Sequence, residues 1–340
     1  MDQMEIVSAM DFASSISESS RIVDLRSASD FSIRRLAVER GAVLVNLPLE
    51  SLLCGDRSSE LPPRDVKLDL LVSPLQDLEE VRGLFLAKVS KATGASRTPW
   101  KVGRVAIATD DFFGCLPPRS VASGPPSLKP PFPRLWRPDS MVESVLLPLL
   151  KGAFSSGGAG NVVDLGSGAG RDVAFLAENL LSSKGGGGDD QDRWKVFGID
   201  NHKGARRRSD RLWQNRGVSE CAELVGVNLK KLADFEAFRN DRGPLKFLYC
   251  VRYLNRPLLL HLSESITLPA SIVALSHFTV EADGTFPYDH PKLSDVVKLG
   301  EMEGIFKDDA WEVLHNDRVR DSDAGRLLIN FVARRRHCNT

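Results

Sequence analysis

The chain contains 340 residues, of which 42% are hydrophobic and 26% are charged, as in a soluble globular protein with room for two domains. Its 45 Lys and Arg residues balance its 45 Asp and Glu residues, so the zero net charge gives no global attraction to nucleic acid or to a membrane surface. The N-terminal segment has no apolar core of signal-peptide length, and no run reaches about 18 apolar residues. We therefore expect a soluble cytoplasmic or nuclear protein with no membrane partner.

The cysteines are too widely spaced to suggest a disulfide framework or a metal site. No two of them form a CxxC pair, and none has a nearby His that would complete a zinc site. We expect free thiols in a reducing compartment, and no bound metal, at Cys54, Cys115, Cys221, Cys250 and Cys338.

The N-terminal third alternates between strand and helix patterns. RIVDLRS predicts a strand, SDFSIRRLAV a short helix, and GAVLVNLPLESLL a second strand that runs into a turn. These segments resemble a rhodanese-like domain: Asp24, Leu25 and Arg26 correspond to its DVR motif, and Phe31 follows at the expected distance. GAVLVNLPLESL likewise matches the GAxNIPL segment of that family. The resemblance covers roughly residues 8–115 and implies a small α/β domain over residues 1–115.

The segment that corresponds to the sulfur-carrying loop argues against activity. Rhodaneses carry sulfur on a Cys whose thiolate is stabilised by surrounding backbone N–H donors. Here that segment reads VKLDLLVSPLQDLEE, with Ser73 and Pro74 in place of the Cys and with acidic residues after them. Because proline removes a donor and carboxylates repel an anion, we predict that the rhodanese-like module is inactive.

Residues 116–138 are rich in proline and small polar residues, which is typical of a semi-rigid linker. Trp136 departs from this composition, because a large aromatic side chain in a linker usually packs against another surface. We expect a second domain over residues 139–340.

A strand, a glycine turn and a helix follow one another in NVVDLGSGAGRDVAFLAE, residues 161–178. Gly166, Ser167, Gly168 and Gly170 form a tight turn that lets a ligand approach the backbone closely. The GK[ST] ending of a P-loop is absent, and GSGAGR departs from the GxGxxG spacing of a dinucleotide site. Asp164 adds negative charge just before the turn, which disfavours a pyrophosphate and suits a cationic ligand such as a sulfonium that carries an amino group.

This order resembles motif I of class I S-adenosylmethionine-dependent methyltransferases. The resemblance spans about residues 134–336 and implies a Rossmann-like, seven-stranded α/β fold with its ligand at the carboxyl ends of the strands. It implies that Asp200, after WKVFGI, holds both ribose hydroxyls, and that Asn228, at the end of a third strand, pairs with the adenine edge. The implied cofactor is S-adenosyl-L-methionine, and the implied binding residues are Trp136, Asp164, Gly166, Ser167, Gly168, Gly170, Asp200, Asn201, Asn228, Cys250 and Val251.

Three further motifs, RLWRPDSMV, VRYLNRPLL and KLGEMEGIF, resemble tellurite-resistance and thiopurine methyltransferases. This resemblance implies that Trp136 lies over the methionine portion of the cofactor, where it would make a cation–π contact with the sulfonium. A simple hydrophobic anchor is the alternative interpretation of Trp136.

Methyl transfer mainly requires that the nucleophile be aligned with the activated methyl group and that water be excluded. Arg252, Tyr253, His261 and His277 are the candidate helpers near the expected mouth of the site. The [DN]PP[YF] signature is replaced by CVRY, which argues against N6-adenine and N4-cytosine methylation. We therefore favour a small-molecule acceptor, with thiols and chalcogen compounds as the leading class because soft nucleophiles need little help from a base.

A basic segment supports an alternative acceptor. Residues 193–216 hold many basic side chains with Trp194 and Trp213 among them, and such a surface can follow phosphates and stack bases. RNA methylation is therefore the alternative function, although the charges are also those of an ordinary solvated helix face. A non-catalytic protein whose two modules only recognise partners is the third hypothesis, and no pattern in the sequence indicates an oligomeric state.

Overall fold

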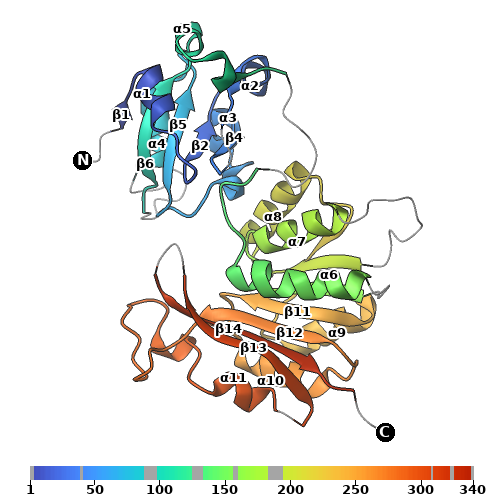
Figure 1. Ribbon diagram of the computed structural model, residues 1–340. Helices are drawn as coiled ribbons and strands as arrows, with labels where there is room; N and C mark the ends of the chain where they lie inside the picture. Colours follow the sequence, from blue (N-terminus) through green and yellow to red (C-terminus); the bar gives the residue numbers. More distant parts are fainter. Residues whose placement is uncertain are drawn as a thin grey trace. The chain divides into compact units, whose positions relative to one another are not determined.

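The computed structural model describes residues 4–38, 41–87, 98–124, 133–155, 160–182, 194–307, 309–321 and 325–337. The chain divides into two compact units, residues 1–137 and 138–340, and each has a central β-sheet of its own (Figure 1). The division falls at the end of the predicted linker.

The first unit is built on a five-stranded parallel sheet in the order β1-β6-β5-β2-β4. The strands are β1 (Glu5–Ile6), β2 (Arg21–Asp24), β4 (Val43–Asn46), β5 (Lys67–Val72) and β6 (Lys101–Ile107), and β3 (Arg35–Leu36) pairs separately with β7 (Val121–Ala122). The helices are α1 (Ala9–Ser14), α2 (Ala28–Ile33), α3 (Leu49–Leu53), α4 (Leu78–Phe85) and α5 (Asp110–Gly114), with 3-10 turns at Ser58–Glu60 and Pro118–Ser120.

Side chains of β5 explain why helices cover both faces of this sheet. Leu70 packs with residues of α3 and α4, whereas Leu71 packs with residues of α1, α2 and α5. A central parallel strand buried on both faces requires such a continuous apolar run. The first unit is thus an α/β domain, as the alternating patterns predicted, and its resemblance to rhodanese-like domains stays a prediction.

The described parts of residues 116–138 do not form the separate spacer that their proline-rich composition suggested. Leu116 and Leu135 are buried in the core clusters of the first unit, and Val121 lies in β7, which pairs with β3. Trp136 is also buried. The apolar side chains in this segment bury surface that a free linker would leave in water, so its described parts belong to the first unit. Residues 125–132 lie outside the described residues.

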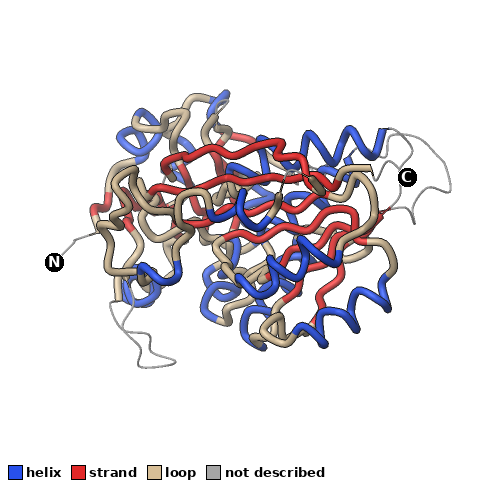
Figure 2. Tube along the Cα trace, turned by 90° about the horizontal axis from the view of Figure 1, so that it is seen from below, coloured by secondary structure: helices blue, strands red, loops and turns tan. Residues whose placement is uncertain are grey.

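The second unit contains a seven-stranded sheet in the order β10-β9-β8-β11-β12-β14-β13. The strands are β8 (Gly160–Leu165), β9 (Trp194–Ile199), β10 (Ala222–Val225), β11 (Leu245–Val251), β12 (Ile272–Phe278), β13 (Trp311–Arg320) and β14 (Leu327–Arg335). Strands β8 to β12 are parallel, and β14 runs antiparallel between β12 and β13. Figure 2 shows the twist of the strands.

Helices cover both faces of the second sheet. They are α6 (Leu147–Ser155), which continues a π-helical turn at Val142–Leu146, with α7 (Arg171–Ser182), α8 (Lys203–Asn215), α9 (Leu232–Arg242), α10 (Arg256–Ser265) and α11 (Glu301–Ile305), and a 3-10 turn lies at Leu293–Asp295. Helices α6, α7 and α8 lie on one face and α9, α10 and α11 on the other (Figure 1). The strand order reverses at β8, and ligands of doubly wound sheets bind at such a point. The seven-stranded, Rossmann-like fold expected for this unit is confirmed.

Two simpler expectations concern membranes and thiols. Within the part of the chain that the structure describes, no helix is long and apolar enough to cross a membrane. No disulfide joins the described cysteines, of which Cys54 and Cys115 are exposed and Cys221 and Cys250 are buried.

Candidate functional site

A cavity of about 160 Å³ opens at the carboxyl ends of β8, β9, β10 and β11 in the second unit. It lies where the strand order reverses, the position at which this fold binds its ligands. Six of the residues singled out from the sequence line it, together with three neighbours: Gly166, Asp200, Asn201, Asn228, Arg252 and Tyr253, with Val227, Leu229 and Lys230.

The glycines of the loop after β8 have backbone conformations that favour glycine. Gly166, Gly168 and Gly170 have φ values of 87°, 55° and 70°. A Cβ on Gly166 would lie 2.6 Å from Cγ of Tyr253, and a Cβ on Gly170 would lie 2.6 Å from Nε1 of Trp213. A Cβ on Gly168 would meet no atom within 4 Å. Two of the glycines therefore allow close packing, and the third faces open space.

Backbone N–H groups of this loop already have acceptors inside the protein. Those of Gly166 and Ser167 donate to the carbonyl of Ile199 at 2.9 Å, and that of Gly168 donates to Asp200 Oδ2 at 3.1 Å. The Gly170 N–H donates to the Ser167 carbonyl at 2.8 Å. These four N–H groups are therefore not available to a phosphate ligand.

Helix α8 holds the loop from the other side. Ser209 Oγ donates to the Gly168 carbonyl at 2.9 Å, and Trp213 Nε1 donates to the Gly170 carbonyl at 2.8 Å. Trp213 is only 2% exposed and Trp194 only 4%. The interpretation of these two tryptophans as base-stacking residues was therefore wrong, because both rings are packed inside the fold.

Asp200 and Asn228 both lie at the cavity, and each also serves the backbone. Asp200 Oδ1 accepts from the His202 N–H at 2.7 Å while Oδ2 accepts from Gly168. Asn228 Oδ1 accepts from the Lys230 N–H at 3.2 Å. Strand β10 ends at Val225, so Asn228 caps a turn and does not end a strand as its sequence position suggested. A carboxylate oxygen accepts more than one hydrogen bond, so Asp200 retains capacity for a ligand.

The residues that follow β11 supply one wall of the cavity. Arg252 is not glycine yet has φ of 55°, and such strain often marks a functional position. Its Nη2 donates to Asp321 Oδ2 at 2.7 Å, and its guanidinium lies 4.7 Å from the ring centre of Phe278. Burial raises the pKa of Tyr253, so its hydroxyl stays protonated at neutral pH.

Other candidate residues lie outside the lining of the cavity. Cys250 is buried, and burial together with the charge of Asp164 raises the pKa of its thiol, so it is no nucleophile at neutral pH. Val251 is half-buried beside it. His277 lies on β12 with Nε2 2.8 Å from the Asp295 carbonyl, and burial lowers its pKa. His261 Nε2 lies 2.5 Å from Glu236 Oε1, between α10 and α9.

Sequence reasoning singled out the buried Asp164 but missed that the half-buried residues Asp139 and Asp172 lie near it, and we call these three residues the acid cluster. Asp164 is the penultimate residue of β8 and is 2% exposed, and its Oδ1 has no hydrogen-bond partner of ordinary geometry among the described residues. Asp172 Oδ1 accepts from the Asp139 backbone N–H at 2.9 Å. Asp139 Oδ2 in turn accepts from Ser276 Oγ at 2.9 Å. The chain positions of Asp139 and Asp172 gave no sign that they meet.

Burial dominates the electrostatics of the acid cluster. Burial, and then the charge of Asp139, raise the pKa of Asp172 to about 7. Burial and the charge of Asp172 raise the pKa of Asp164 well above its usual range, and burial also raises the pKa of Asp139. The structure shows no cluster of metal-ligating side chains within its described residues. Perturbed carboxyl groups beside a cavity are typical of functional sites.

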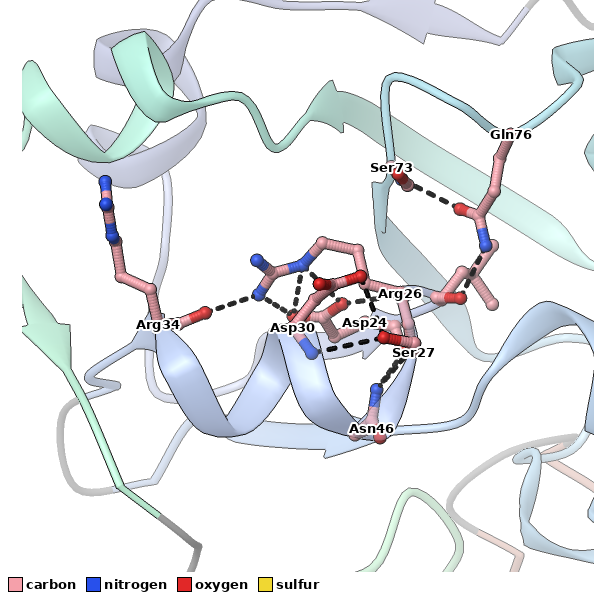
Figure 3. A network of polar contacts seen from close by, with 9 residues as sticks. Asp24, Arg26, Ser27, Asp30, Arg34, Asn46, Ser73 and Gln76 are labelled. Atoms are coloured by element: carbon pink, nitrogen blue, oxygen red, sulfur yellow. Dashed lines mark hydrogen bonds and ion pairs between the residues drawn. The ribbon is translucent and has the colours of Figure 1, made fainter.

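The corresponding strand ends of the first unit are occupied by its own side chains (Figure 3). The Ser73 N–H donates to Gln76 Oε1 at 2.8 Å, and Gln76 Nε2 donates to the Leu25 carbonyl at 2.6 Å. Arg26 forms a buried ion pair with Asp24 at 2.6 Å. The Ser73 N–H, at the start of the loop after β5, therefore has its acceptor, Gln76, within the same loop.

No protein-family model and no curated protein matches the sequence. Among solved structures, the chain is similar to the [4+2]-cyclase SpnF, at 11% identity over 56% of this chain and 80% of that one, with a TM-score of 0.40. It is similar to TehB from Haemophilus influenzae, at 15% identity over 56% of this chain and 62% of that one, with a TM-score of 0.39. A third is a putative sarcosine dimethylglycine methyltransferase from Galdieria sulphuraria, at 13% identity, covering 55% and 84%, with a TM-score of 0.39. The fold assignment accordingly depends on the strand order given above.

Proposed function

We propose that the second unit binds S-adenosylmethionine and transfers its methyl group to a small molecule. The observation that carries this proposal is the cavity at the strand-order reversal, which brings together the glycine loop, Asp200 and Asn228. These residues follow three separate strands, and the resemblance to class I methyltransferases implies a cofactor role for each of them.

Charge supports a cationic cofactor over a dinucleotide. The N–H groups of Gly166, Ser167, Gly168 and Gly170 already have acceptors in the protein, and Asp200 adds negative charge beside the loop. A sulfonium that carries an amino group gains from a neighbouring carboxylate, whereas a pyrophosphate is repelled by it. Asp164 Oδ1 and Ser167 Oγ are buried polar atoms without partners among the described residues, and a ligand would satisfy them.

The residues present fit the parts of this cofactor. Asp200 would accept hydrogen bonds from the ribose hydroxyls, Asn228 would meet the adenine edge, and Val227 and Leu229 would give the base an apolar wall. Bound S-adenosylmethionine would supply a methyl group activated by its positively charged sulfur. The protein would then align the acceptor and exclude water.

The side chains available to assist the methyl acceptor favour a nucleophile that needs no strong base. Tyr253 stays protonated, and the His277 ring hydrogen-bonds to a carbonyl away from the cavity lining. Thiols and chalcogen compounds are soft nucleophiles that match such a site, and we propose them as the acceptor class.

RNA remains the second candidate because Lys203, Arg207 and Arg208 are exposed on α8, beside the loop that this helix holds. Phosphate contacts would have to come from these cations alone, since Trp194 and Trp213 are buried. A two-module protein that binds partners without catalysis is the third candidate.

We further propose that the first unit transfers no sulfur. Ser73 stands where the resemblance places a Cys, and the Ser73 N–H is bound by Gln76. The full chain should show no thiosulfate-to-cyanide turnover. Turnover that disappears on Cys54→Ser would show that the reactive loop lies elsewhere.

Calorimetry on the full chain tests the cofactor assignment. S-adenosylmethionine and S-adenosylhomocysteine should both bind at one site per chain, and mass spectrometry of the purified protein should detect retained S-adenosylhomocysteine. Absence of binding by both ligands at millimolar concentration would overturn the proposed function.

A further inference from the structure

Three aromatic residues at and after the carboxyl end of β12 pack against one arginine. Phe278, Phe286 and Tyr288 follow one another with ring centres 6.5 and 5.3 Å apart, and all three residues are half-buried. The guanidinium of Arg326, just before β14, lies 5.4 Å from the ring centre of Phe278 and 5.2 Å from that of Tyr288. We call these four residues the aromatic–arginine group.

The aromatic–arginine group adjoins the cavity of the second unit through Arg252. Arg252 lines the cavity, and its guanidinium lies 4.7 Å from the ring centre of the same Phe278. The Arg252 N–H also donates to the Ser276 carbonyl at 2.8 Å, which ties the chain after β11 to the end of β12. The group therefore lies on the β12 side of the cavity, whereas the strand order places Asp200 and Asn228, which follow β9 and β10, on the other side.

The two arginines that contact Phe278 differ in how their charges are offset. Arg252 donates to Asp321 at 2.7 Å and lies 3.9 Å from Asp139, so carboxylates already face it. Arg326 is half-buried and forms no ion pair with an acid that the structure describes, and its Nη1 donates to the His290 carbonyl at 2.9 Å. A guanidinium carries five N–H donors, and a partly buried charge attracts an anion more strongly than one in water does.

We propose that Arg326 binds a carboxylate of the methyl acceptor, and that the acceptor is a thiol that carries this carboxylate. This inference rests on the proposed function and narrows its acceptor class. An arginine binds a carboxylate through two parallel N–H···O bonds, and the one charge of Arg326 that no described acid offsets matches a group with one negative charge. The rings of Phe278 and Tyr288 would pack against the apolar part of the acceptor.

The thiol of such an acceptor would lie toward Arg252 and the cavity, on the β12 side of the cofactor. Its sulfur forms the new bond to the methyl group as the bond between that methyl group and the sulfonium breaks. The thiol proton passes to the solvent, and the products are a thioether and neutral S-adenosylhomocysteine. Arg326 takes no part in this bond exchange and acts only by binding and orienting the acceptor.

Calorimetry on the full chain saturated with S-adenosylhomocysteine tests this contact, with 3-mercaptopropionate as the probe and its methyl ester as the uncharged counterpart. The acid should bind at least about tenfold more tightly than the ester, because its carboxylate forms charge-assisted hydrogen bonds. Arg326→Gln should abolish this preference, and Arg326→Lys should keep part of it. The KM values for methylation by S-adenosylmethionine should follow the same order, with kcat nearly unchanged.

Arg334→Gln is the matched control, because Arg334 lies at the opposite end of β14 and pairs there with Glu312. It should bind the acid and the ester as the native chain does. The comparison of acid and ester in the native chain depends on no variant, so it tests the inference even if Arg326→Gln fails to fold.

Three results would overturn the inference and leave the cofactor assignment standing. They are an acid that binds no better than its ester, a preference for the acid that survives in a folded Arg326→Gln chain, and acid binding that depends on Arg326 but yields no methylated product. The last result would mean that the anion site does not serve the acceptor. Absence of S-adenosylhomocysteine binding would overturn both the inference and the proposed function.

Discussion

The loops that follow β5 in the first unit and β8 in the second occupy equivalent places, each after a buried parallel strand. In the first unit, Gln76 satisfies the loop N–H of Ser73, and Arg26 satisfies the buried Asp24. In the second unit, Asp164 Oδ1 and Ser167 Oγ stay without partners among the described residues, and burial raises the pKa of the neighbouring carboxyl groups. A network in which the buried polar groups have partners needs no ligand to satisfy it, whereas a network with unpartnered buried groups suggests that a ligand completes it.

The largest expected effect is that of Gly166→Ala in the glycine loop after β8. The substitution combines a left-handed backbone with a contact between Cβ and the Tyr253 ring, and together these should destabilise the second unit by about 2 to 5 kcal/mol. Denaturant unfolding would measure the loss, and cofactor binding should disappear with it.

Gly217→Ala is the matched control, because φ there is 63° and no atom lies within 4 Å of the added Cβ. It should show the backbone cost alone. Adding Tyr253→Ala to Gly166→Ala should recover part of the stability. An unchanged free energy of unfolding in Gly166→Ala would mean that the loop is not held as described.

A second prediction concerns the cost in folding stability of the acid cluster. The pKa of Asp172 is raised to about 7, above its value in the unfolded chain, so the native state binds more protons than the unfolded state between about pH 4 and pH 7. The native chain should therefore lose stability as the pH rises through this window. Asp172→Asn should match it near about pH 3.5 and exceed it above about pH 7 by about 2 to 4 kcal/mol in urea unfolding. A variant that is less stable than the native chain at pH 8 would contradict this assignment.

A third prediction tests the cofactor contact itself. Asp200→Ala would remove the proposed charge-assisted hydrogen bonds to the ribose and also the acceptor of the Gly168 N–H, so cofactor affinity should fall at least about tenfold, with each such bond contributing roughly 1.5 to 3 kcal/mol. Asp210→Ala makes the same charge change on the exposed face of α8 and should leave the affinity unchanged. Calorimetry compares the two, and equal affinities would remove Asp200 from the site.

Sequence reasoning located the cavity because parallel strands bring their carboxyl ends to one edge. Gly166, Asp200 and Asn228 follow three different strands, and the strand patterns together with the family resemblance indicated them, although Asn228 lies beyond the end of β10. The sequence could not show that Trp213 turns inward to hold the Gly170 carbonyl, because its basic neighbours on α8 remain at the surface.

The same limit explains why the acid cluster was missed. Asp139 caps the helix that begins at Ser140, whereas Asp172 lies in the first turn of α7, and both positions are ordinary places for an acid. Only the packing of that helix against the ends of β8 and β12 brings their charges together. Local sequence therefore predicted the glycine loop after β8 but not the carboxyl groups that surround it.

The smallest expected effect concerns the loop after β5, in which Gln76 accepts from the Ser73 N–H. Gln76→Ala leaves the Ser73 N–H without its acceptor, while the Leu25 carbonyl keeps its bond from the Leu49 N–H. Because Ser73 is only half-buried and water can replace the lost acceptor, the first unit should lose only about 1 kcal/mol in denaturant unfolding. Gln214→Ala, which removes an exposed side-chain bond on α8, should cost less, and both variants should bind the cofactor as the native chain does. If Gln76→Ala instead gave the first unit affinity for thiosulfate or another small anion, the loop after β5 would be a ligand site that its own glutamine keeps closed, and the contrast between the two loops would be one of degree.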